Sequence, residues 1–414
     1  MGLGTFVSQP ARKGASAAAR RAAPIRGDML LLVVVIALMI FGLLMLYSAS
    51  LDFSKRIYEG NATYMFNKQL LWLLLGGATA ALLMRTDYHL WQRLAVPVMV
   101  VTVGLLIGVL INNQIRFGAV RSFFGGSVQP SELAKLVTVL YLSVWLYAKR
   151  DFLHDVQLGL IPLAAILGML GGLIYIQPDL SAAATIFILG GLLFFLAGGE
   201  LRQIVLFLIV AVIAGWIVVQ FSATGRARLA SYVIGLKNPL QSDYQVRRSL
   251  EALIRGEWFG LGLGNSITKV TGLPVPPTDS IFAVVTEELG LLGTMCLIGL
   301  YGLLLWRGLR IAAKAPDSLG AVMAAGLTFW IVIEAVINMA VMVGLLPFAG
   351  NALPFVSYGG SNLVSTLAAI GILFNISRQS GASVPETGER RMYGATVDLR
   401  RRDRRRRVSR AGRA

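Results

Sequence analysis

The sequence predicts an all-α, polytopic membrane protein with ten transmembrane helices and one large loop. Of its 414 residues, 56% are hydrophobic and only 14% are charged, whereas soluble domains carry about 25% charged residues. The mean hydropathy is +0.69. Apolar runs of about 20 residues, the length that crosses a bilayer, recur along the chain. Cys296 is the only cysteine, which excludes a disulfide-stabilised secreted domain.

The ten predicted spans follow one another through short connections, except between the seventh and the eighth. The first is too long for the apolar region of a signal peptide and has no clear cleavage pattern, so we expect it to be retained. The spans are expected at residues 29–50, 68–84, 93–112, 131–148, 157–176, 180–198, 202–222, 280–306, 318–346 and 360–377.

The distribution of charge predicts the orientation. The net charge is +17, and most of the basic excess lies in the two tails, 1–28 and 379–414. An even number of spans places both tails on one side, and their arginines make that side the cytoplasm. The tails are rich in Ala, Gly and Arg and lack the apolar residues of a core, so we expect disordered cytoplasmic segments flanking a membrane domain at 29–378. Basic residues in such tails do not indicate a nucleic-acid partner.

The long loop at 223–279 lies on the outer side in this topology. Long loops follow the charge rule weakly, so its basic residues are either indifferent or attract an anion at the outer leaflet. Residues 245–258 have helical spacing, with Val246, Leu250, Leu253 and Ile254 on one face, which predicts an interfacial amphipathic helix. The basic residues of the loop are Arg226, Arg228, Lys237, Arg247, Arg248, Arg255 and Lys269.

Ionisable side chains at the ends of spans are the first candidates for a site, because each one needs a partner or a cavity. Glu132 and Lys135 are i,i+3 neighbours at the start of the fourth span, as a self-neutralising pair or as the polar wall of an outward-facing cavity. Asp179, in the turn before the sixth span, is a helix cap or part of the same wall. Glu334 and Asn338 share a face of the ninth span, and an interhelical hydrogen bond explains them.

Asp279 follows a proline-rich approach to the eighth span. Pro274, Pro276 and Pro277 stiffen this connection and hold Asp279 at the outer mouth of the bundle. The residue is either the N-cap of the helix or a general base beside a cationic cavity. Glu287 and Glu288 follow about two turns deeper, where we expect one of them to meet a basic or polar partner.

Residues 353–362 form a Pro- and Gly-rich turn before the tenth span, and this turn contains Ser357. Non-helical backbone at membrane depth is tolerated only where it is buried in protein or lines a cavity, which makes this turn a candidate wall of the same site. The glycines at 260–264 follow no strand and do not fit a dinucleotide fingerprint. With two histidines far apart and one cysteine, no His/Cys metal cluster is expected.

Five ordered motifs make the chain resemble the SEDS family, the shape, elongation, division and sporulation proteins. They are QPSELAK at 129–135, QPDLS at 177–181, WFGLGLGNS at 258–266, PPTDSIFAVVTEELGLLG at 276–293 and GLLPFAGNALPFVSYGGSN at 344–362. The chain departs from the family pattern at Arg121-Ser122, where an Arg-Trp pair is usual. It departs again at PVPPTDS, which lacks the His and Phe of the usual PE-x-HTDF.

The resemblance implies a ten-helix glycosyltransferase of the bacterial cytoplasmic membrane that polymerises lipid II. A class B penicillin-binding protein and other membrane proteins of division or elongation would be its partners. The family's catalytic aspartate carries over to Asp279, and its cavity residues to Glu132 and Lys135. The YSAS end of the first span, the tails and the SYGGSN turn favour the division-type member, active at the septum, over the elongation type.

The mechanism expected from the resemblance is attack by the GlcNAc 4-hydroxyl of one lipid-linked disaccharide on the anomeric carbon of the growing chain. Asp279 would take the proton, and Lys135, Arg247 and Arg248, or a divalent cation, would stabilise the departing diphosphate. The other expected substrate-binding residues are Asp179, Gln245 and Ser357, together with Glu132. A lipid II flippase and a non-catalytic scaffold for a penicillin-binding protein are the rival functions.

Overall fold

A computed structural model describes residues 27–112 and 129–380 of the chain. The predicted tail segments lie almost wholly outside these residues, as does Arg121-Ser122. Within the described residues the secondary structure is helical, with turns and no strand. Every backbone group in a helix bonds within its own segment, which is what a spanning element needs in hydrocarbon. The fold class predicted from the sequence is therefore confirmed.

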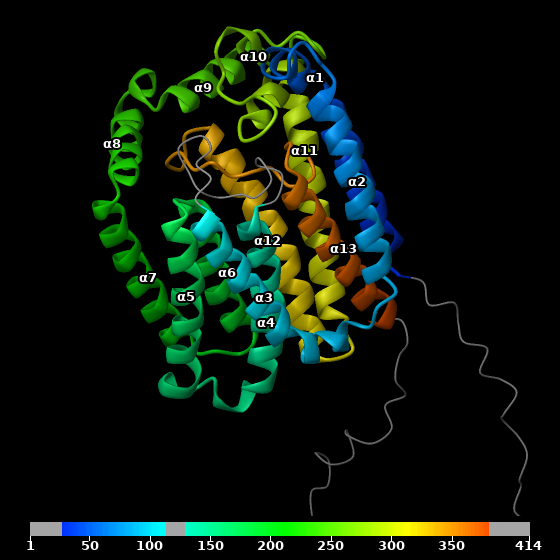
Figure 1. Ribbon diagram of the computed structural model, residues 1–414, viewed down its shortest axis with the longest axis vertical. Coiled ribbons are helices and arrows are strands. Elements are labelled where there is room, and N and C mark those ends of the chain that lie inside the picture. The colour runs from blue at the N-terminus through cyan, green and yellow to red at the C-terminus, as the bar shows by residue number, and fades with distance from the viewer. Residues whose placement is uncertain (1–26, 113–128, 381–414) are drawn as a thin grey trace, which may run out of the picture. The chain divides into compact units, whose positions relative to one another are not determined.

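A helix occurs at each of the ten predicted positions (Figure 1). Eight of the helical segments are long and apolar enough to cross a membrane, while α6, with 17 residues, is shorter and α2 does not meet both conditions. Ten crossings therefore remain a prediction. The helices are α1 (Met29–Ile57), α2 (Tyr64–Leu83), α3 (Trp91–Asn112), α4 (Pro130–Ala148), α5 (Ile161–Ile176), α6 (Leu180–Leu196), α7 (Leu201–Phe221), α11 (Ile281–Ala313), α12 (Ser318–Met342) and α13 (Gly360–Ser380).

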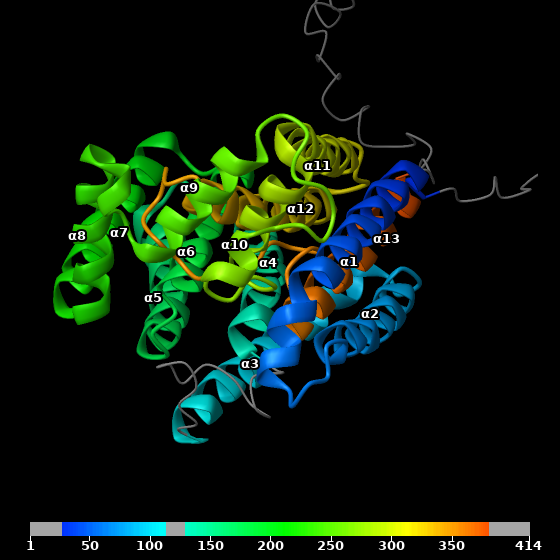
Figure 2. The ribbon, with the colours of Figure 1, turned by 90° about the horizontal axis from the view of Figure 1, so that it is seen from above.

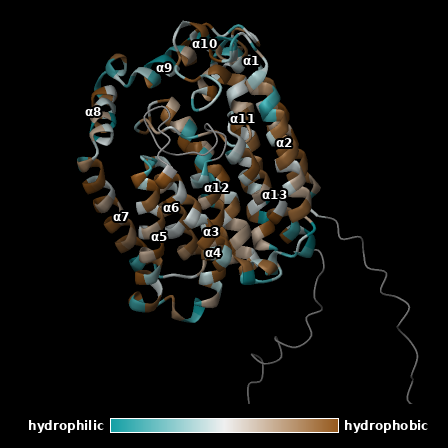
Figure 3. Ribbon diagram, viewed as in Figure 1, coloured by the Kyte–Doolittle hydropathy of each residue, from teal (hydrophilic) through white to brown (hydrophobic). Residues whose placement is uncertain are grey.

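The core lies around α12 and α13. In their most apolar stretches 72% of α12 and 89% of α13 is buried, against 11% for α7, so α7 lies at the periphery. α12 packs against α4, α6 and α11, and α13 packs against α2, α4 and α12. The helices are mostly brown, that is hydrophobic, along their length in Figure 3 and carry teal residues towards their ends. Polar side chains on α12 and α13 therefore have to find partners inside protein.

The predicted loop forms α8 (Ala223–Lys237), α9 (Tyr244–Gly256) and α10 (Thr268–Thr271). α9 and α10 lie across one end of the bundle, near the start of α11, in both views (Figures 1 and 2). We call this the loop end. The amphipathic helix predicted at 245–258 is present as α9, but small and polar side chains such as Gln245 and Ser249 face the bundle, while Ile254 is 77% exposed.

Helix α11 is broken at Gly290, whose φ of 64° and ψ of −166° are not helical. In an unbroken helix, Leu291 and Leu292 would donate to the carbonyls of Glu287 and Glu288. They donate instead to Glu257 and Trp258, at 2.9 and 3.2 Å, while Leu261 and Gly262 donate to the two vacated carbonyls. The Gly-rich loop at 256–262 thus completes the backbone of the broken helix. The half-helix before the break begins at Ile281, two residues after Asp279.

Candidate functional site

Asp279 lies at the loop end, immediately before Ser280, which is the N-cap residue of α11. Ser280 thus occupies the N-cap position considered for Asp279, although its side chain makes no capping hydrogen bond. Asn338 of α12 donates to the Asp279 carbonyl at 2.9 Å. The carboxylate lies close to Gly350. A methyl group built on Gly350 would be only 2.9 Å from Oδ2 of Asp279. The side chain is half-buried, so it borders open space.

The approach to Asp279 is held by the turn before α13 and by α9. Ser357 Oγ donates to the carbonyl of Thr278 at 2.7 Å, and the N–H of Tyr358 donates to that of Pro277 at 2.8 Å. Gln245 of α9 donates to Ser280 Oγ, which in turn donates to Pro274 at 2.8 Å. Ser357 and Gln245, both expected to bind substrate, therefore contact the residues on either side of Asp279, the Thr278 carbonyl and the Ser280 hydroxyl respectively, and both are buried.

Asp179 joins the same end of the bundle. Its Oδ1 accepts from the N–H of Ala182 at 3.2 Å, so it is the cap of α6, and its Oδ2 accepts from Gln129 and Ser131 of the α4 start at 3.0 and 3.1 Å. The hydroxyl of Ser181 lies 3.0 Å from Asp179 Oδ1 and 3.3 Å from the carbonyl of Gly350. Through this hydroxyl the Asp179 cluster borders the segment that Asp279 touches.

Lys135 forms ion pairs with two carboxylates. Its ammonium lies 2.9 Å from Glu132 Oε1 and also bonds Glu334 of α12, and the Lys135 side chain is 1% exposed. Asn362 of α13 donates to Glu132 at 2.7 Å and lies 3.4 Å from Glu334. Two carboxylates thus face the single positive charge of Lys135. Lys135 therefore presents no isolated charge to a diphosphate, and its proposed contact with one is not supported by this packing.

Glu334 is the residue of this cluster that the sequence analysis assigned to a plain interhelical hydrogen bond. Its carboxylate is fully buried and pairs with Lys135, while its carbonyl accepts from Asn351 at 3.1 Å. The signal in the sequence was the cost of an unpaired carboxylate in a span, which requires a cationic partner. Spacing along one helix could not identify that partner, because Lys135 lies on another helix.

Glu287 and Glu288 form a second buried cluster. Glu288 pairs with Lys269 at 2.7 Å and accepts from Ser48 of α1 at 2.7 Å. Glu287 accepts from the backbone N–H groups of Ile267 and Thr268, at 3.1 and 3.2 Å, and from hydroxyls of the same loop. The expectation that one of the pair meets a basic or polar partner is confirmed, and both do. The cluster ties the loop before Asp279 to the half-helix after it.

The two loop arginines expected at the diphosphate are held elsewhere. Arg248 pairs with Glu251 and donates to Thr271 at 2.7 and 2.9 Å. Arg247 lies over the ring of Tyr244, 5.4 Å from the ring centroid, and is exposed on α9. These two guanidinium groups thus contact α9 itself and Thr271.

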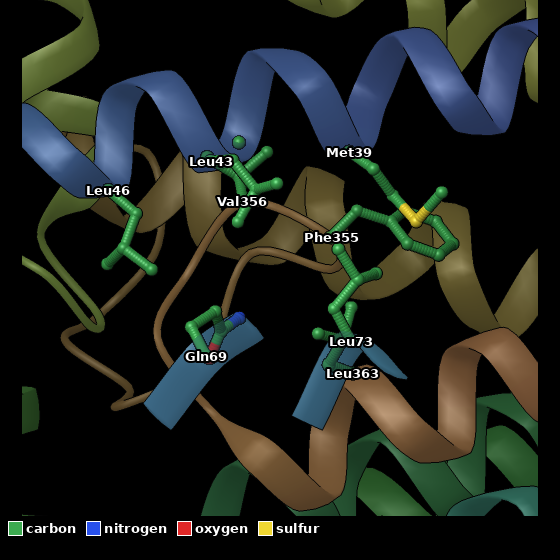
Figure 4. A pocket seen from close by; sticks show the side chains of 9 residues that line it. Met39, Leu43, Leu46, Gln69, Leu73, Phe355, Val356 and Leu363 are labelled. Carbon is green, nitrogen blue, oxygen red and sulfur yellow. The ribbon is translucent and has the colours of Figure 1, made fainter. Parts of the chain in front are cut away.

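Two cavities adjoin the site. A small one, of about 10 Å³, lies between α1, α2 and the turn before α13, where Gln69, Phe355 and Val356 line it (Figure 4). It has room for a water molecule at most. A larger one, of about 790 Å³, lies among α9, α11 and α12 and is lined mostly by apolar side chains such as Phe282, Met295 and Met339. Its lining suits hydrocarbon, such as a lipid chain or a transmembrane helix, better than a sugar.

The described residues contain no group of three or more His, Cys, Asp or Glu side chains that could hold a metal ion. The carboxylates of the loop end are instead bonded to ammonium, amide, hydroxyl and backbone groups. A divalent cation beside the diphosphate remains a prediction from the chemistry.

The fold and the site together define a polytopic helical membrane protein with a carboxylate at the mouth of a polar, hydrogen-bonded end. The model of the cell cycle protein family named for FtsW, RodA and SpoVE matches residues 28–382, and the chain belongs to this family.

Relatives of known name agree with this assignment. The chain is 38% identical over 355 residues to the probable peptidoglycan glycosyltransferase FtsW of Trichlorobacter lovleyi, a match that covers 84% of this chain and 93% of the relative. It is 37% identical over 360 residues to the stage V sporulation protein E of Bacillus subtilis, a match that covers 85% of this chain and 97% of the relative.

Solved structures share the fold. One, described as the structural coordination of polymerization and crosslinking by a peptidoglycan synthase complex, superposes with a TM-score of 0.71 at 26% identity over 86% of this chain and 98% of the other. The rod shape determining protein RodA of Thermus thermophilus superposes with a TM-score of 0.60 at 26% identity, over 85% of this chain and 97% of the other.

Proposed function

We propose that this protein is a peptidoglycan glycosyltransferase that polymerises lipid II into glycan strands. The observation that carries the proposal is the half-buried carboxylate of Asp279, held at the mouth of the bundle by contacts from α9, α12 and the turn before α13. The two relatives described above belong to the same family, and one is named a probable peptidoglycan glycosyltransferase.

In the proposed reaction, Asp279 is the general base. It takes the proton from the 4-hydroxyl of the GlcNAc of the acceptor, whose oxygen forms a bond with the anomeric carbon of the donor MurNAc. The bond between that carbon and the diphosphate oxygen breaks, and undecaprenyl diphosphate leaves with the electron pair. A positioned base is worth about 10²–10⁴-fold in rate. The contacts on the carbonyls of Thr278 and Asp279 and on the hydroxyl of Ser280 restrict where the carboxylate lies, which is what proton transfer requires.

The loop end then faces outwards in the bacterial cytoplasmic membrane, with both termini in the cytoplasm. The arginine-rich tails support this orientation. We place the activity at the division septum, as the FtsW relatives suggest, with a RodA-type role in elongation as the alternative of the same chemistry.

A penicillin-binding protein is the proposed partner. A structural neighbour is part of a peptidoglycan synthase complex of polymerization and crosslinking. The apolar groove among α9, α11 and α12 is large enough, at about 790 Å³, to accept hydrocarbon from the substrate's lipid chain or from the membrane helix of a partner.

The test uses purified protein and lipid II, with the transpeptidase partner present and absent. Asp279→Asn keeps the size of the side chain and removes the base, so we expect it to bind lipid II and to form no polymer above background. Asp52→Asn, an exposed aspartate near the loop-end terminus of α1, is the matched control and is expected to polymerise at the wild-type rate. Polymer from Asp279→Asn at that same rate would remove Asp279 as the base. If wild-type protein with its partner makes no polymer from competent lipid II, then transport or scaffolding is the function.

A further inference from the structure

A single side-chain amide on α12 holds two segments of backbone that meet at the Asp279 carboxylate. The Nδ2 of Asn338 donates to the carbonyl of Asp279 at 2.9 Å and to the carbonyl of Asn351 at 2.5 Å. An amide nitrogen carries two hydrogens, so each carbonyl can take one of them. Asn351 directly follows Gly350, the residue that lies close to Oδ2 of Asp279. Asn338 therefore bonds both the residue that carries the carboxylate and the segment beside it.

The segment beside the carboxylate is itself fixed to two helices. The side-chain Nδ2 of Asn351 donates to the carbonyl of Glu334 at 3.1 Å, one helical turn before Asn338 on α12. The hydroxyl of Ser181 in α6 lies 3.3 Å from the carbonyl of Gly350. Asn351 is thus held by α12 through its side chain and through its carbonyl. The bond from Asn338 to Asp279 then joins the backbone of Asp279 to this fixed segment.

Asn338 has little freedom to adopt another arrangement. Its side chain is buried, with 1% of the residue exposed, and that of Asn351 is 4% exposed. Turning the amide over would set its oxygen against two carbonyl oxygens, so the two acceptors determine its orientation. Within the described residues Oδ1 of Asn338 has no hydrogen-bond partner, which makes an amide a poor side chain for filling space alone. Its distinctive contribution is the link between the two carbonyls.

We propose that Asn338 is a positioning residue of the transfer reaction, which fixes the separation between Asp279 and the backbone of Gly350 and Asn351 and so keeps the carboxylate directed at the acceptor hydroxyl. Because Asn338 is buried, it acts through Asp279 and does not touch the substrate. This assignment rests on the glycosyl transfer proposed above and adds to it a residue that lies 59 positions along the chain from the base.

The first test compares Asn338→Leu, Asn338→Gln and Thr328→Val in the lipid II polymerisation assay. Leu is close to Asn in size and has no donor. A misplacement of about 1 Å can cost up to 10²-fold, so kcat of Asn338→Leu is expected to fall about 10- to 10²-fold. KM is expected to stay within about twofold, because the contacts with substrate are unchanged. Asn338→Gln is expected to recover part of the rate, since it returns the NH₂ group on a longer side chain.

Thr328→Val is the matched control. Thr328 is a fully buried polar residue of the same helix, and its hydroxyl bonds the carbonyl of Ala324 within that helix. We expect this variant to keep the wild-type kcat and KM. A kcat for Asn338→Leu equal to that of Thr328→Val, or a loss that appears only in KM, would overturn the proposal.

The second test measures the separation itself and needs no activity. Cys296, the only cysteine, is first replaced by Cys296→Ser, and Asp279→Cys is then combined with Gly350→Cys in the full chain. A disulfide requires the two Cβ atoms to come within about 3.5–4.5 Å, so the rate of its formation under copper phenanthroline, followed by mass spectrometry of the linked peptides, reports on the gap. The bonds from Asn338 are retained in this pair because they go to backbone carbonyls.

Adding Asn338→Leu to the cysteine pair is expected to slow the cross-linking at least about threefold, while adding Thr328→Val is expected to leave it unchanged. An equal cross-linking rate with Asn338→Leu refutes the inference whether or not the protein polymerises lipid II, as does a pair that fails to cross-link with Asn338 in place. Failure of the inference is therefore separable from failure of the proposed function. If Asn338→Leu does not yield folded protein, Asn338→Ser carries the same comparison, because one hydroxyl hydrogen cannot bond both carbonyls.

Discussion

The pair formed by Lys269 and Glu288 offers a quantitative test of how the loop end is held together. The ammonium and carboxylate are 2.7 Å apart, with side chains that are 4% and 0% exposed. Breaking a buried pair by removing one partner leaves an uncompensated charge, at a cost of about 3–5 kcal/mol. Lys269→Met does this, because Met keeps much of the volume of Lys and leaves Glu288 with hydrogen bonds from Ser48 and the backbone of Ser266.

A double-mutant cycle separates the pair from other effects of substitution. Glu288→Gln together with Lys269→Met removes both charges, so we expect it to be more stable than Lys269→Met alone, with a coupling energy of up to about 3 kcal/mol. Arg255→Met is the control, because its pair with Glu251 is 41% and 34% exposed and worth about 0–1 kcal/mol.

The measurement is the free energy of unfolding, from titration of each purified variant with SDS in mixed micelles and far-UV circular dichroism. A Lys269→Met protein that loses no more stability than Arg255→Met would refute the reasoning. The same result would show that the loop before Asp279 is held mainly by the bonds of Glu287 and by the backbone contacts at Gly290.

Two further predictions concern the site. Gly350→Ala places a methyl group 2.9 Å from Oδ2 of Asp279, so the carboxylate must shift; we expect polymerisation of lipid II to fall about tenfold or more with little change in stability, since a misplacement of about 1 Å can cost up to 10²-fold. Gly77→Ala, where nothing lies within 4 Å of the new methyl, is its control and should keep full activity. Glu334→Gln leaves Lys135 with one carboxylate in a fully buried position, and we expect it to lower the SDS midpoint, while the double variant Glu334→Gln with Lys135→Met recovers part of the loss. A double variant less stable than Glu334→Gln would contradict that pairing.

Much of the fold was predictable from the sequence because the membrane makes the rule simple. A span needs about 20 apolar residues, and its backbone bonds within itself, so the ten long helices of the bundle could be located without their neighbours. The position of Asp279 at the start of α11 followed in the same way, from prolines that prevent helix and an apolar run that permits it. The i,i+3 pair of Glu132 and Lys135 was also local, since both residues lie on one turn.

Local pattern could not predict which faces meet. The helix at α9 was predicted, yet the face that packs against the bundle carries Gln245 and Ser249, because close packing there favours small side chains and a bond to Ser280. Likewise, the spacing of the glycines at 260–264 did not by itself predict a structural role for them. Their backbone approaches Gly290 and completes the broken α11, which is a contact between segments about 30 residues apart along the chain.

The sequence by itself determined that this chain is a helical membrane protein, where its helices lie and which ionisable residues need partners. Only the tertiary structure decided the partners. Glu334 meets Lys135, Lys269 meets Glu288, and Asp279 meets the backbone of Gly350. The physical reason is that burying a charge is costly wherever it occurs, so its presence in the sequence signals a pair. Which opposite charge completes the pair depends on how the helices pack around it.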